Sequence, residues 1–530
     1  MTSTSDAPST SSPPPAGRGS GHHRGEMLTG LVRGASLTTV GAVLNAGLGF
    51  VLTVVIARSL GVRDSGVLFT GTALFTLVTV LGKMGADTGL VRDLAQRRPL
   101  GRYREDRRLL LLALLPVLLA TTALGAAAWT ASDVLAGIVF NDAGASGGTV
   151  LRVLALVLPF GALSLVAVAA SRGLGDLVPL VLVENVGKPA LRVVLCLVVG
   201  LVGGGLTAMV WAWAAPALLA CAVAGLLLAR RLRGRQGPEQ EPPLPWRGLA
   251  GPFWSFAGPR GVAAALDVAN SSVGILLVSA LSGTGQAAVL AGSMRYAVAG
   301  TLGLQAIRLV VMAPMSQLLS AGDVKGAERL HQTTTLLALV VTGPLYVLLG
   351  LHAGTALSLL GDDFSAGAPV LVLLCLAMMV NLVTGNVQVV LLMGGRSRTN
   401  LAAVLTGLLL NIALAALLVP SYGALAAAGA WAVAVCVENL WYARAARRQM
   451  GVHTVTRQVW VLLAVLAGSF LLPGLVLERL LGPSWWSLIL QLSVSICAYL
   501  LLLYVNRRSF SYAEALVAKL RRRVTAEPGG

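Results

Sequence analysis

Residues 254–281, which read WSFAGPRGVAAALDVANSSVGILLVSAL, decide the class of this chain. A helix needs about 20 mostly apolar residues to cross a bilayer, and this stretch is longer than that. It nevertheless contains Arg260 and Asp267. A charge at such depth costs several kcal/mol unless it faces a partner or a water-filled cavity. The stretch therefore predicts a membrane-spanning helix with a polar face, in a protein with a polar interior.

The composition of the whole chain agrees with a membrane protein. Of its 530 residues, 56% are hydrophobic and 12% are charged, and the mean hydropathy is +0.80. A soluble core with a wettable surface cannot be built from such a chain. The net charge of +18 does not indicate nucleic-acid binding, because the Lys and Arg residues stand mainly in short clusters between apolar runs. Membrane orientation and contact with anionic lipid explain such clusters.

The cysteines and histidines show no spacing typical of a disulfide framework or a metal site. A GxxxxGK[ST] phosphate loop is also missing from the sequence. No metal or other cofactor is therefore expected. The five cysteines fall within apolar runs, which indicates small buried hydrophobic residues, and they are Cys196, Cys221, Cys375, Cys436 and Cys497.

Successive apolar runs predict an all-α polytopic membrane protein with about fourteen membrane-spanning helices. Gly and Pro inside several runs are compatible with this, because neighbouring helices can satisfy the freed backbone groups. The runs lie near residues 35–57, 65–86, 109–130, 150–171, 178–202, 206–229, 254–281, 286–317, 333–352, 367–393, 400–420, 423–443, 458–477 and 484–505.

The charges in the connections predict the orientation, because cytoplasmic connections collect Lys and Arg. Arginine clusters follow the second, sixth, twelfth and last runs, whereas aspartates follow the third and the ninth. The arginine clusters follow even-numbered runs and the aspartates follow odd-numbered runs, so the two sets of connections lie on opposite sides of the membrane. We therefore expect both termini in the cytoplasm. The aspartates are Asp133, Asp142, Asp362 and Asp363.

A weak internal repeat predicts two similar halves. Ser171-Arg172-Gly173 corresponds to Gly395-Arg396-Ser397, and Leu60-Gly61 corresponds to Ser282-Gly283, both at an offset of about 220 residues. We therefore expect two six-helix lobes related by a pseudo-two-fold axis along the membrane normal, followed by two more helices. The predicted units are a disordered tail (1–27), an N-terminal lobe (28–235), a cytoplasmic linker (236–250), a C-terminal lobe (251–450), two additional helices (451–506) and a basic amphipathic tail (507–530).

Two groups of short motifs resemble the polysaccharide flippase branch of the multidrug/oligosaccharidyl-lipid/polysaccharide exporter superfamily. Together they extend over most of the membrane region. The first group is Ala57-Arg58-Ser59-Leu60-Gly61, Ser65-Gly66 and Gly89-Leu90-Val91-Arg92. The second group is Met393-Gly394-Gly395-Arg396, Asn411, Val419-Pro420-Ser421-Tyr422-Gly423-Ala424, Ala427 and Ala428.

This resemblance implies two six-helix lobes around a central cavity and no enzymatic reaction. The implied activity is translocation of a polyprenyl-pyrophosphate-linked oligosaccharide from the inner to the outer leaflet, by alternating access, for cell-surface polysaccharide biosynthesis. Expected partners are this lipid-linked saccharide, the bilayer and other polysaccharide assembly proteins. The excess of Arg over Lys is typical of a GC-rich bacterial source, so we expect a multi-pass protein of the bacterial cytoplasmic membrane.

The seventh predicted span supplies three candidate substrate-binding residues. Arg260, Asp267 and Asn270, together with Gly274, follow one another at intervals of seven, three and four residues. These intervals keep all four within one helical stripe. Such a stripe needs a polar surface or water opposite it.

The eighth predicted span supplies three more. Gln305 and Arg308 share a stripe with Thr301, whereas Arg295 points about 80° away from Gln305. Arginine suits a pyrophosphate, because its planar fork makes bidentate, charge-assisted hydrogen bonds. We therefore expect a cationic cavity that stabilises the head group in transit.

A structural role is the alternative for these charges. Arg260 and Asp267 would then pair and hold helices together, while Arg308 would reach the cytoplasmic surface. Lys83, the last candidate binding residue, has Asp87 four residues later, so the two can neutralise each other.

Other polar residues in the spans allow two interpretations each. Glu184 and Lys188 repeat the i, i+4 spacing, and there a structural role is favoured. Glu438 is either a proton-linked carboxylate or the partner of a basic neighbour, and Gln388 either binds ligand or joins helices by hydrogen bonds.

Three other functions compete with the flippase. A cation-coupled multidrug exporter of the same superfamily would favour unpaired carboxylates in the cavity, and a peptidoglycan-precursor flippase would share most features. A membrane polysaccharide polymerase or ligase would need a catalytic group of residues in an outer loop. The longest outer connections, near 131–149 and 353–366, contain no convincing acid/base or nucleophile arrangement.

Overall fold

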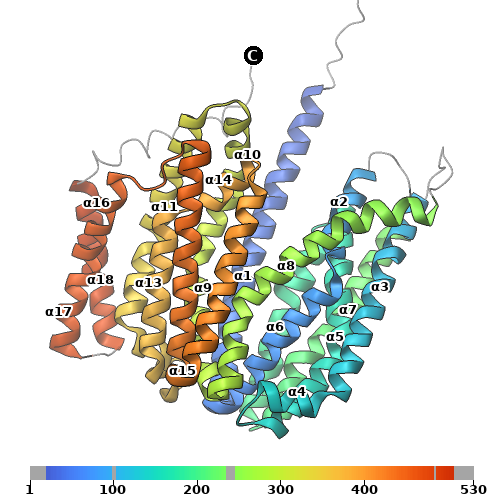
Figure 1. The fold of residues 1–530 in the computed structure, drawn as a ribbon, viewed down its shortest axis with the longest axis horizontal. Helices are drawn as coiled ribbons and strands as arrows, with labels where there is room; N and C mark the ends of the chain where they lie inside the picture. Colours follow the sequence, from blue (N-terminus) through green and yellow to red (C-terminus); the bar gives the residue numbers. More distant parts are fainter. Residues whose placement is uncertain (1–19, 98–102, 234–244, 483–484, 506–530) are drawn as a thin grey trace, which may run out of the picture.

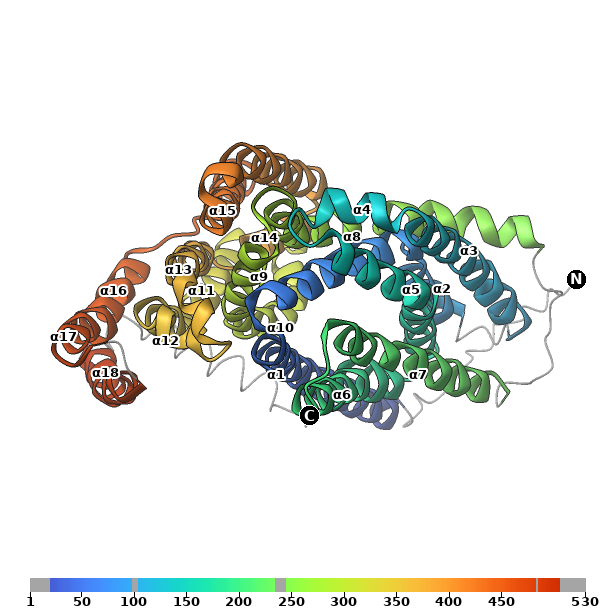
Figure 2. The ribbon, with the colours of Figure 1, turned by 90° about the horizontal axis from the view of Figure 1, so that it is seen from below.

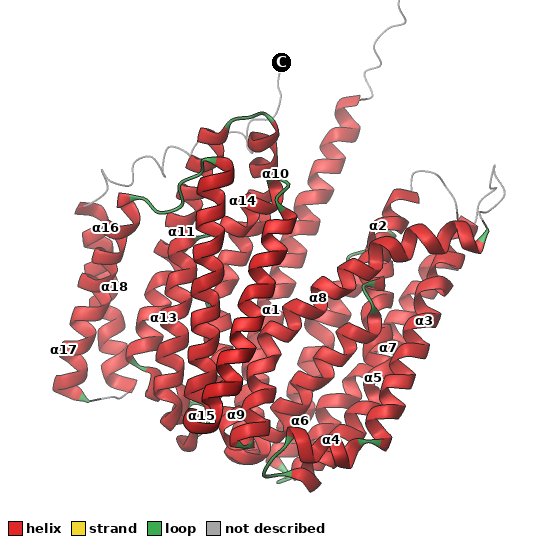
Figure 3. Cartoon of the chain, viewed as in Figure 1, coloured by secondary structure: helices red, strands yellow, loops and turns green. Residues whose placement is uncertain are grey.

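The computed structural model describes residues 20–97, 103–233, 245–482 and 485–505. These residues form helices joined by short connections, with no strand among them (Figure 3). An all-helical fold follows from the sequence, because a bilayer offers no partners for backbone N–H and C=O groups and helices satisfy those groups internally.

The elements follow one another with few residues between them. Two of them, η2 and η4, are π-helical, and η3 is a 3-10 helix. The elements are α1 (Ser20–Lys83), α2 (Ala86–Arg97), α3 (Tyr103–Thr130), α4 (Ser132–Val139), α5 (Gly144–Gly173), η2 (Leu180–Gly187), α6 (Lys188–Leu201), α7 (Leu206–Arg233), α8 (Trp246–Ser282), α9 (Thr284–Ala299), α10 (Thr301–Ser320), α11 (Val324–Leu351), α12 (Ala353–Ser358), η3 (Asp362–Gly367), α13 (Ala368–Thr384), α14 (Val387–Met393), α15 (Ser397–Met450), α16 (Arg457–Leu466), η4 (Ala467–Leu471), α17 (Leu472–Leu481) and α18 (Trp485–Val505).

In the described part of the chain, ten helices are long and apolar enough to cross a membrane. Two of the ten are double length. Gly61 (φ 72°, ψ −179°) divides α1, and Gly423 (φ 55°, ψ −134°) divides α15, so each provides two passes. The pairs η2–α6 and α9–α10 have span length only when taken together. The total is consistent with the fourteen spans expected.

The helices form two lobes with an added group at one edge. Helices α1–α7 make the first lobe and α9–α15 the second, while α8 runs diagonally between them (Figure 1). Seen from below, α16, α17 and α18 lie beside the second lobe, away from the first (Figure 2). This arrangement agrees with the predicted fold class of two lobes plus C-terminal helices.

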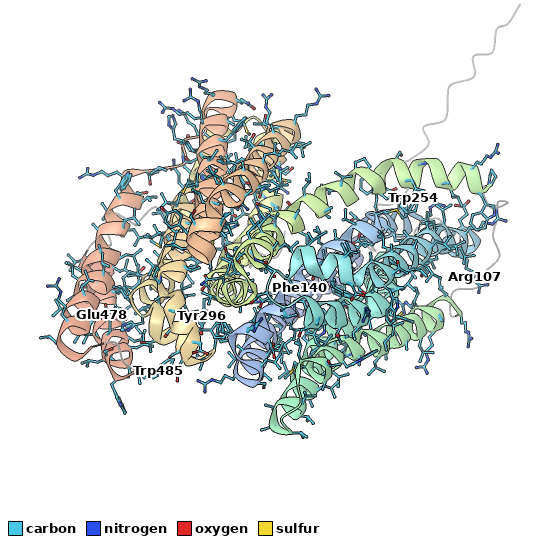
Figure 4. All side chains as sticks on the ribbon, turned by 60° about the horizontal axis from the view of Figure 1, so that its bottom comes forward. Arg107, Phe140, Trp254, Tyr296, Glu478 and Trp485 are labelled. Carbon is cyan, nitrogen blue, oxygen red and sulfur yellow. The ribbon has the colours of Figure 1, made fainter. Side chains whose placement is uncertain are left out.

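The buried cores show that the lobes are joined at one end only. A single core contains residues of both lobes, including Phe140 near α4 and Tyr296 of α9, which lie where the lobes meet (Figure 4). We call this the lower end, as in Figure 1. A separate core around Leu90 and Leu109 belongs to the first lobe and the start of α8, and another around Met315 belongs to the second lobe. The lobes thus pack together at the lower end and have independent cores at the upper end.

Polar contacts reinforce the lower-end junction. Asp142, between α4 and α5, accepts a hydrogen bond from the backbone N–H of Thr284 at 2.9 Å, which satisfies the first turn of α9. Arg63 of α1 lies 3.5 Å from the Asp142 carboxylate. Arg58 of α1 donates to the backbone oxygens of Leu359 (2.8 Å) and Ser358 (3.2 Å) in the second lobe. We call Arg58, Arg63, Asp142 and Thr284 the lower clasp.

The elements depart from the expected boundaries at several places, among them a break at Gly385 between α13 and α14, within the tenth expected span. Helix α1 begins at Ser20, inside the predicted disordered tail, because a helix propagates beyond the bilayer at little cost once it is nucleated. Helix α8 begins at Trp246, inside the predicted linker. Gly300 interrupts the eighth span between α9 and α10. The predicted C-terminal amphipathic helix lies outside the described residues.

Candidate functional site

Helix α8 places Arg260 and Asp267 on an accessible surface and Asn270 closer to the packed interior. The side chains of Arg260 and Asp267 are exposed, and neither forms an ion pair with any residue that the structure describes, although both lie within a membrane-spanning helix. The predicted alternative, a pair between these two residues, is therefore not formed. Asn270 is half-buried, with an Oδ1 atom that has no hydrogen-bond partner. Nearly three helix turns on from Arg260, at Asn270, the polar stripe thus enters the packing.

The interruption at Gly300 separates the polar residues of the eighth span. Arg295 is on α9 and exposed, without a hydrogen bond or ion pair. Gln305 is on α10, also exposed, and donates to Thr301 Oγ1 at 3.1 Å. Arg308 is on α10 and half-buried. Because α9 and α10 are separate helices, the angle expected between Arg295 and Gln305 on one continuous helix does not apply.

Arg308 is the centre of a polar group built from four helices. Its guanidinium donates to Gln388 Oε1 of α14. Tyr442 of α15 lies near both Gln388 and Arg308 and interacts with them electrostatically. Asp267 of α8 interacts electrostatically with Arg308 without an ion-pair contact. The structure thus brings together Asp267 and Arg308, two of the predicted binding residues, and adds Gln388 and Tyr442.

Glu438 of α15 is the second carboxylate of this group. It lies one helix turn before Tyr442 and interacts electrostatically with both Tyr442 and Asp267. Its Oε1 is buried and has no hydrogen-bond partner. Room for the side chain comes from Gly407, since a Cβ there would lie 2.0 Å from Glu438 Oε1. The basic neighbour considered from the sequence is not in contact with this carboxylate.

Two lysine–carboxylate pairs lie within the first lobe. Lys83 Nζ lies 2.6 Å from Asp87 Oδ2, as its spacing indicated, so it is not a free cation. Lys188 and Glu184 also pair, across the π-helical η2. These two pairs resemble structural ion pairs more than ligand sites.

Arg192 of the first lobe is held by an aromatic residue. Its guanidinium lies over the ring of Trp213, 3.8 Å from the centroid, and its Nε donates to the Trp213 backbone oxygen at 2.9 Å. Phe75 packs edge-on against the same ring, at 5.5 Å between centroids. Arg192 therefore has both a cation–π partner and a hydrogen-bond partner within the first lobe.

Three guanidinium groups and two carboxylates thus belong to α8, α9, α10 and the second half of α15, and among them Asp267 interacts with Arg308 and with Glu438. Among the described residues, Arg260 and Arg295 have no hydrogen-bond or ion-pair partner, and neither carboxylate forms an ion-pair contact with Arg308. The formal sum is one positive charge. Such a set can attract an anion and offer it donors from several helices.

Sequence reasoning did not predict that Tyr442, Glu438 and Gln388 would join Arg308. Glu438 and Tyr442 stand at i, i+4, which places them on one face of a helix. That spacing is the available signal, but it does not indicate which other helix the face meets.

Comparison with protein families identifies the chain. Residues 31–319 match the model of a family described as polysaccharide biosynthesis protein. The chain belongs to this polysaccharide biosynthesis protein family. The matched region contains the first lobe from residue 31 onward and the α8–α10 part of the site, whereas Gln388, Glu438 and Tyr442 lie beyond it. Comparison with curated protein sequences finds no match.

Solved structures share the fold of this family member. The lipid II flippase MurJ, in an inward closed conformation, has a TM-score of 0.71 at 14% identity, covering 88% of this chain and 98% of that one. An inward-facing multidrug resistance MATE family transporter of the MOP superfamily has a TM-score of 0.62 at 16% identity, covering 75% and 92%. A MOP superfamily transporter from Pyrococcus furiosus has a TM-score of 0.54 at 14% identity, covering 79% and 95%.

Proposed function

We propose that this protein moves a polyprenyl-pyrophosphate-linked oligosaccharide from the inner to the outer leaflet of a bacterial cytoplasmic membrane. The observation that most supports the proposal is the set of guanidinium groups on α8, α9 and α10. Arg260 and Arg295 are exposed and without a partner inside membrane-spanning helices. Cations in that position are stable only where water or an anion reaches them.

A diphosphate head group matches these guanidinium groups chemically. Arginine remains ionised when it is partly dehydrated and binds phosphate oxygens through two parallel hydrogen bonds. Arg308 is already oriented by Gln388, so less side-chain freedom is lost when it binds. Asp267 and the exposed Gln305 can accept hydrogen bonds from sugar hydroxyls near the head group.

The membrane potential favours the proposed direction. With a negative cell interior, outward movement of an anion gains about 2.3 kcal/mol per unit charge per 100 mV. A doubly charged pyrophosphate group therefore needs no nucleotide hydrolysis to be driven outward.

The arrangement of the lobes supports alternating access from the cytoplasmic side. The upper end, where the lobes have separate cores, is also where the Arg-rich ends of α7 and α15 lie. From the positive-inside rule we infer that this end is cytoplasmic, that the conformation is inward-open and that both termini lie inside. The units predicted from the sequence, with lobes at 28–235 and 251–450, are the bodies proposed to rock against each other.

Export in a deficient strain tests this function. We expect Arg260→Ala and Arg308→Ala each to abolish complementation while the protein still reaches the membrane. Arg329→Ala is the matched control, because Arg329 is an exposed arginine at the upper end of α11, outside the site. Normal export by both site variants would exclude these residues as substrate ligands.

A cation-coupled multidrug exporter is the second candidate. It is supported by Asp267 and Glu438, two interacting carboxylates of which Glu438 has an unpaired, buried oxygen. Efflux of a cationic dye from vesicles would decide between the two. Sodium- or proton-dependent efflux that Glu438→Gln removes would favour the exporter, whereas no efflux in any gradient would favour the flippase.

A further inference from the structure

An apolar cleft lies on the second lobe, at the lower end, far from the polar site. Its volume is about 640 Å³. It is bounded by the end of α11, by α12, by the start of α13, by α15 just after its kink and by α17. Its apolar lining includes Leu351, Ala353, Ala368, Val372, Leu376 and Leu425. Cavities of about 300–1,000 Å³ are large enough to bind small molecules.

The attachment of α17 and α18 to the lobe explains why the cleft is open on one side. Gln491 of α18 pairs with His352 at the end of α11 and donates to the backbone oxygen of Phe470 at 3.0 Å. Tyr499, two turns further along α18, donates to the backbone oxygen of Val340 at 2.9 Å. These bonds hold the added helices against α11, and the space toward α13 stays unfilled by protein.

A single carboxylate, Glu478 of α17, stands in the lining of this cleft. It is half-buried and has no hydrogen-bond or ion-pair partner among the described residues. Arg479 follows it and is exposed, also without a partner. A half-buried carboxylate in the lining is complementary to a cationic group that carries N–H donors.

Nearby tryptophans indicate the depth of Glu478 in the membrane. Trp485 and Trp486 begin α18 and are 48% and 79% exposed. Exposed tryptophans at a helix end are typical of the interface between the hydrocarbon and the head groups. Figure 4 shows Glu478 and Trp485 on the same C-terminal helices. The cleft therefore opens at head-group level and continues into the hydrocarbon layer.

We propose that this cleft binds one phosphatidylethanolamine molecule of the bilayer. An acyl chain fills the apolar part of the cleft. If that part were empty, its lining residues would lose the dispersion contacts that the chain provides. The primary ammonium donates charge-assisted hydrogen bonds to Glu478. A choline head group has no N–H donor, so it cannot make the same bonds, and an anionic head group would be repelled by Glu478.

Lipid retention by the purified full chain tests this proposal. The protein is reconstituted in vesicles of equal parts phosphatidylethanolamine, phosphatidylcholine and phosphatidylglycerol, extracted, and weighed with bound lipid by native mass spectrometry. We expect a one-to-one adduct enriched in phosphatidylethanolamine. Glu478→Gln should lower that adduct at least fivefold, whereas Asp363→Asn, at an exposed acid near the same end and outside the cleft lining, should leave it unchanged.

A second variant keeps the test decisive if Glu478→Gln folds poorly. Ala368→Trp fills the cleft without touching the carboxylate and should also remove the adduct. Equal retention of the three lipids by the wild type, or unchanged phosphatidylethanolamine binding in both variants, would overturn the proposal. The result is independent of whether the protein flips lipid-linked saccharide, since no transport is measured.

Discussion

At the scale of single residues, the polar site around Arg308 depends on small neighbouring residues as well as on charged ones. The side chain of Glu438 occupies room that exists only because residue 407 is glycine. A Cβ at Gly407 would meet three atoms of Glu438, with Oε1 at 2.0 Å and Cγ at 2.5 Å. Gly407 is therefore a determinant of where this carboxylate lies relative to Asp267 and Tyr442.

Gly407→Ala should lower the free energy of unfolding by about 1–3 kcal/mol, the usual cost of overpacking. In a Glu438→Ala background the colliding atoms are gone, so the same substitution should cost little. Gly225→Ala is the control, because a Cβ at Gly225 meets nothing within 4 Å. Denaturant unfolding in detergent measures all four variants. An equal cost with and without Glu438 would contradict this account of the contact.

The sequence allowed the polar residues to be found, but not their partners. Arg260, Asp267 and Arg308 can be recognised in the sequence, because charged residues are rare inside apolar spans. Their neighbours come from helices far away along the chain. No periodicity on α8 or α10 indicates that Gln388 and Tyr442 meet Arg308, because that contact depends on how four helices pack.

At the scale of elements, two glycines determine how the longest helices are divided. Gly61 has φ 72° and ψ −179°, a conformation that is essentially restricted to glycine. Gly423 has φ 55° and ψ −134°, and the next residue, Ala424, donates its N–H to Gln286 of α9 at 3.2 Å. Both glycines belong to the short motifs that suggested the family.

Gly61→Ala should reduce the free energy of unfolding by about 1–3 kcal/mol, the cost of a strained backbone conformation. A Cβ at Gly61 meets nothing within 4 Å, so the loss would come from the backbone alone. Gly47→Ala is the matched control on the same helix, also with nothing within 4 Å, and should be neutral or stabilising. If both substitutions had the same effect, the conformation of Gly61 would not matter for stability.

The elements themselves were largely predictable, and their interruptions were not. Span length is a local property of an apolar run, so the expected ranges agree with the helices to within several residues. The break at Gly300, by contrast, falls within an otherwise continuous apolar stretch. Glycine alone does not predict a break, because many glycines of this chain lie within unbroken helices.

At the scale of the whole molecule, the lobes are in contact at one end and separate at the other. Gly66 of α1 lies very close to the start of α9, because a Cβ at residue 66 would lie 1.9 Å from the backbone oxygen of Thr284. Glycine is required for this contact, because the obstacle is backbone and cannot move aside. The lower clasp surrounds this point and must separate if the lobes rock to open outward.

Gly66→Ala should wedge the lower end apart and shift the population toward the outward-open state. Spin labels at the exposed positions Ala145 and Asp363, one in each lobe, should then report a longer distance distribution than in the otherwise unchanged protein. Gly285→Ala is the control, because its Cβ would reach only Val62 at 4.0 Å. An unchanged distance distribution in Gly66→Ala would show that this contact does not hold the lobes together.

Transport of a polyprenyl-pyrophosphate-linked oligosaccharide by purified protein in vesicles tests the central claim most directly. The vesicles carry an imposed potential, and the quantity measured is the fraction of substrate reaching the opposite leaflet over time. The account predicts transport that increases with the potential. It also predicts that Arg308→Ala and Arg260→Ala each slow transport about 10–100-fold, since a hydrogen bond to a charged group contributes about 1.5–3 kcal/mol. Transport at the wild-type rate by both folded variants would contradict the account.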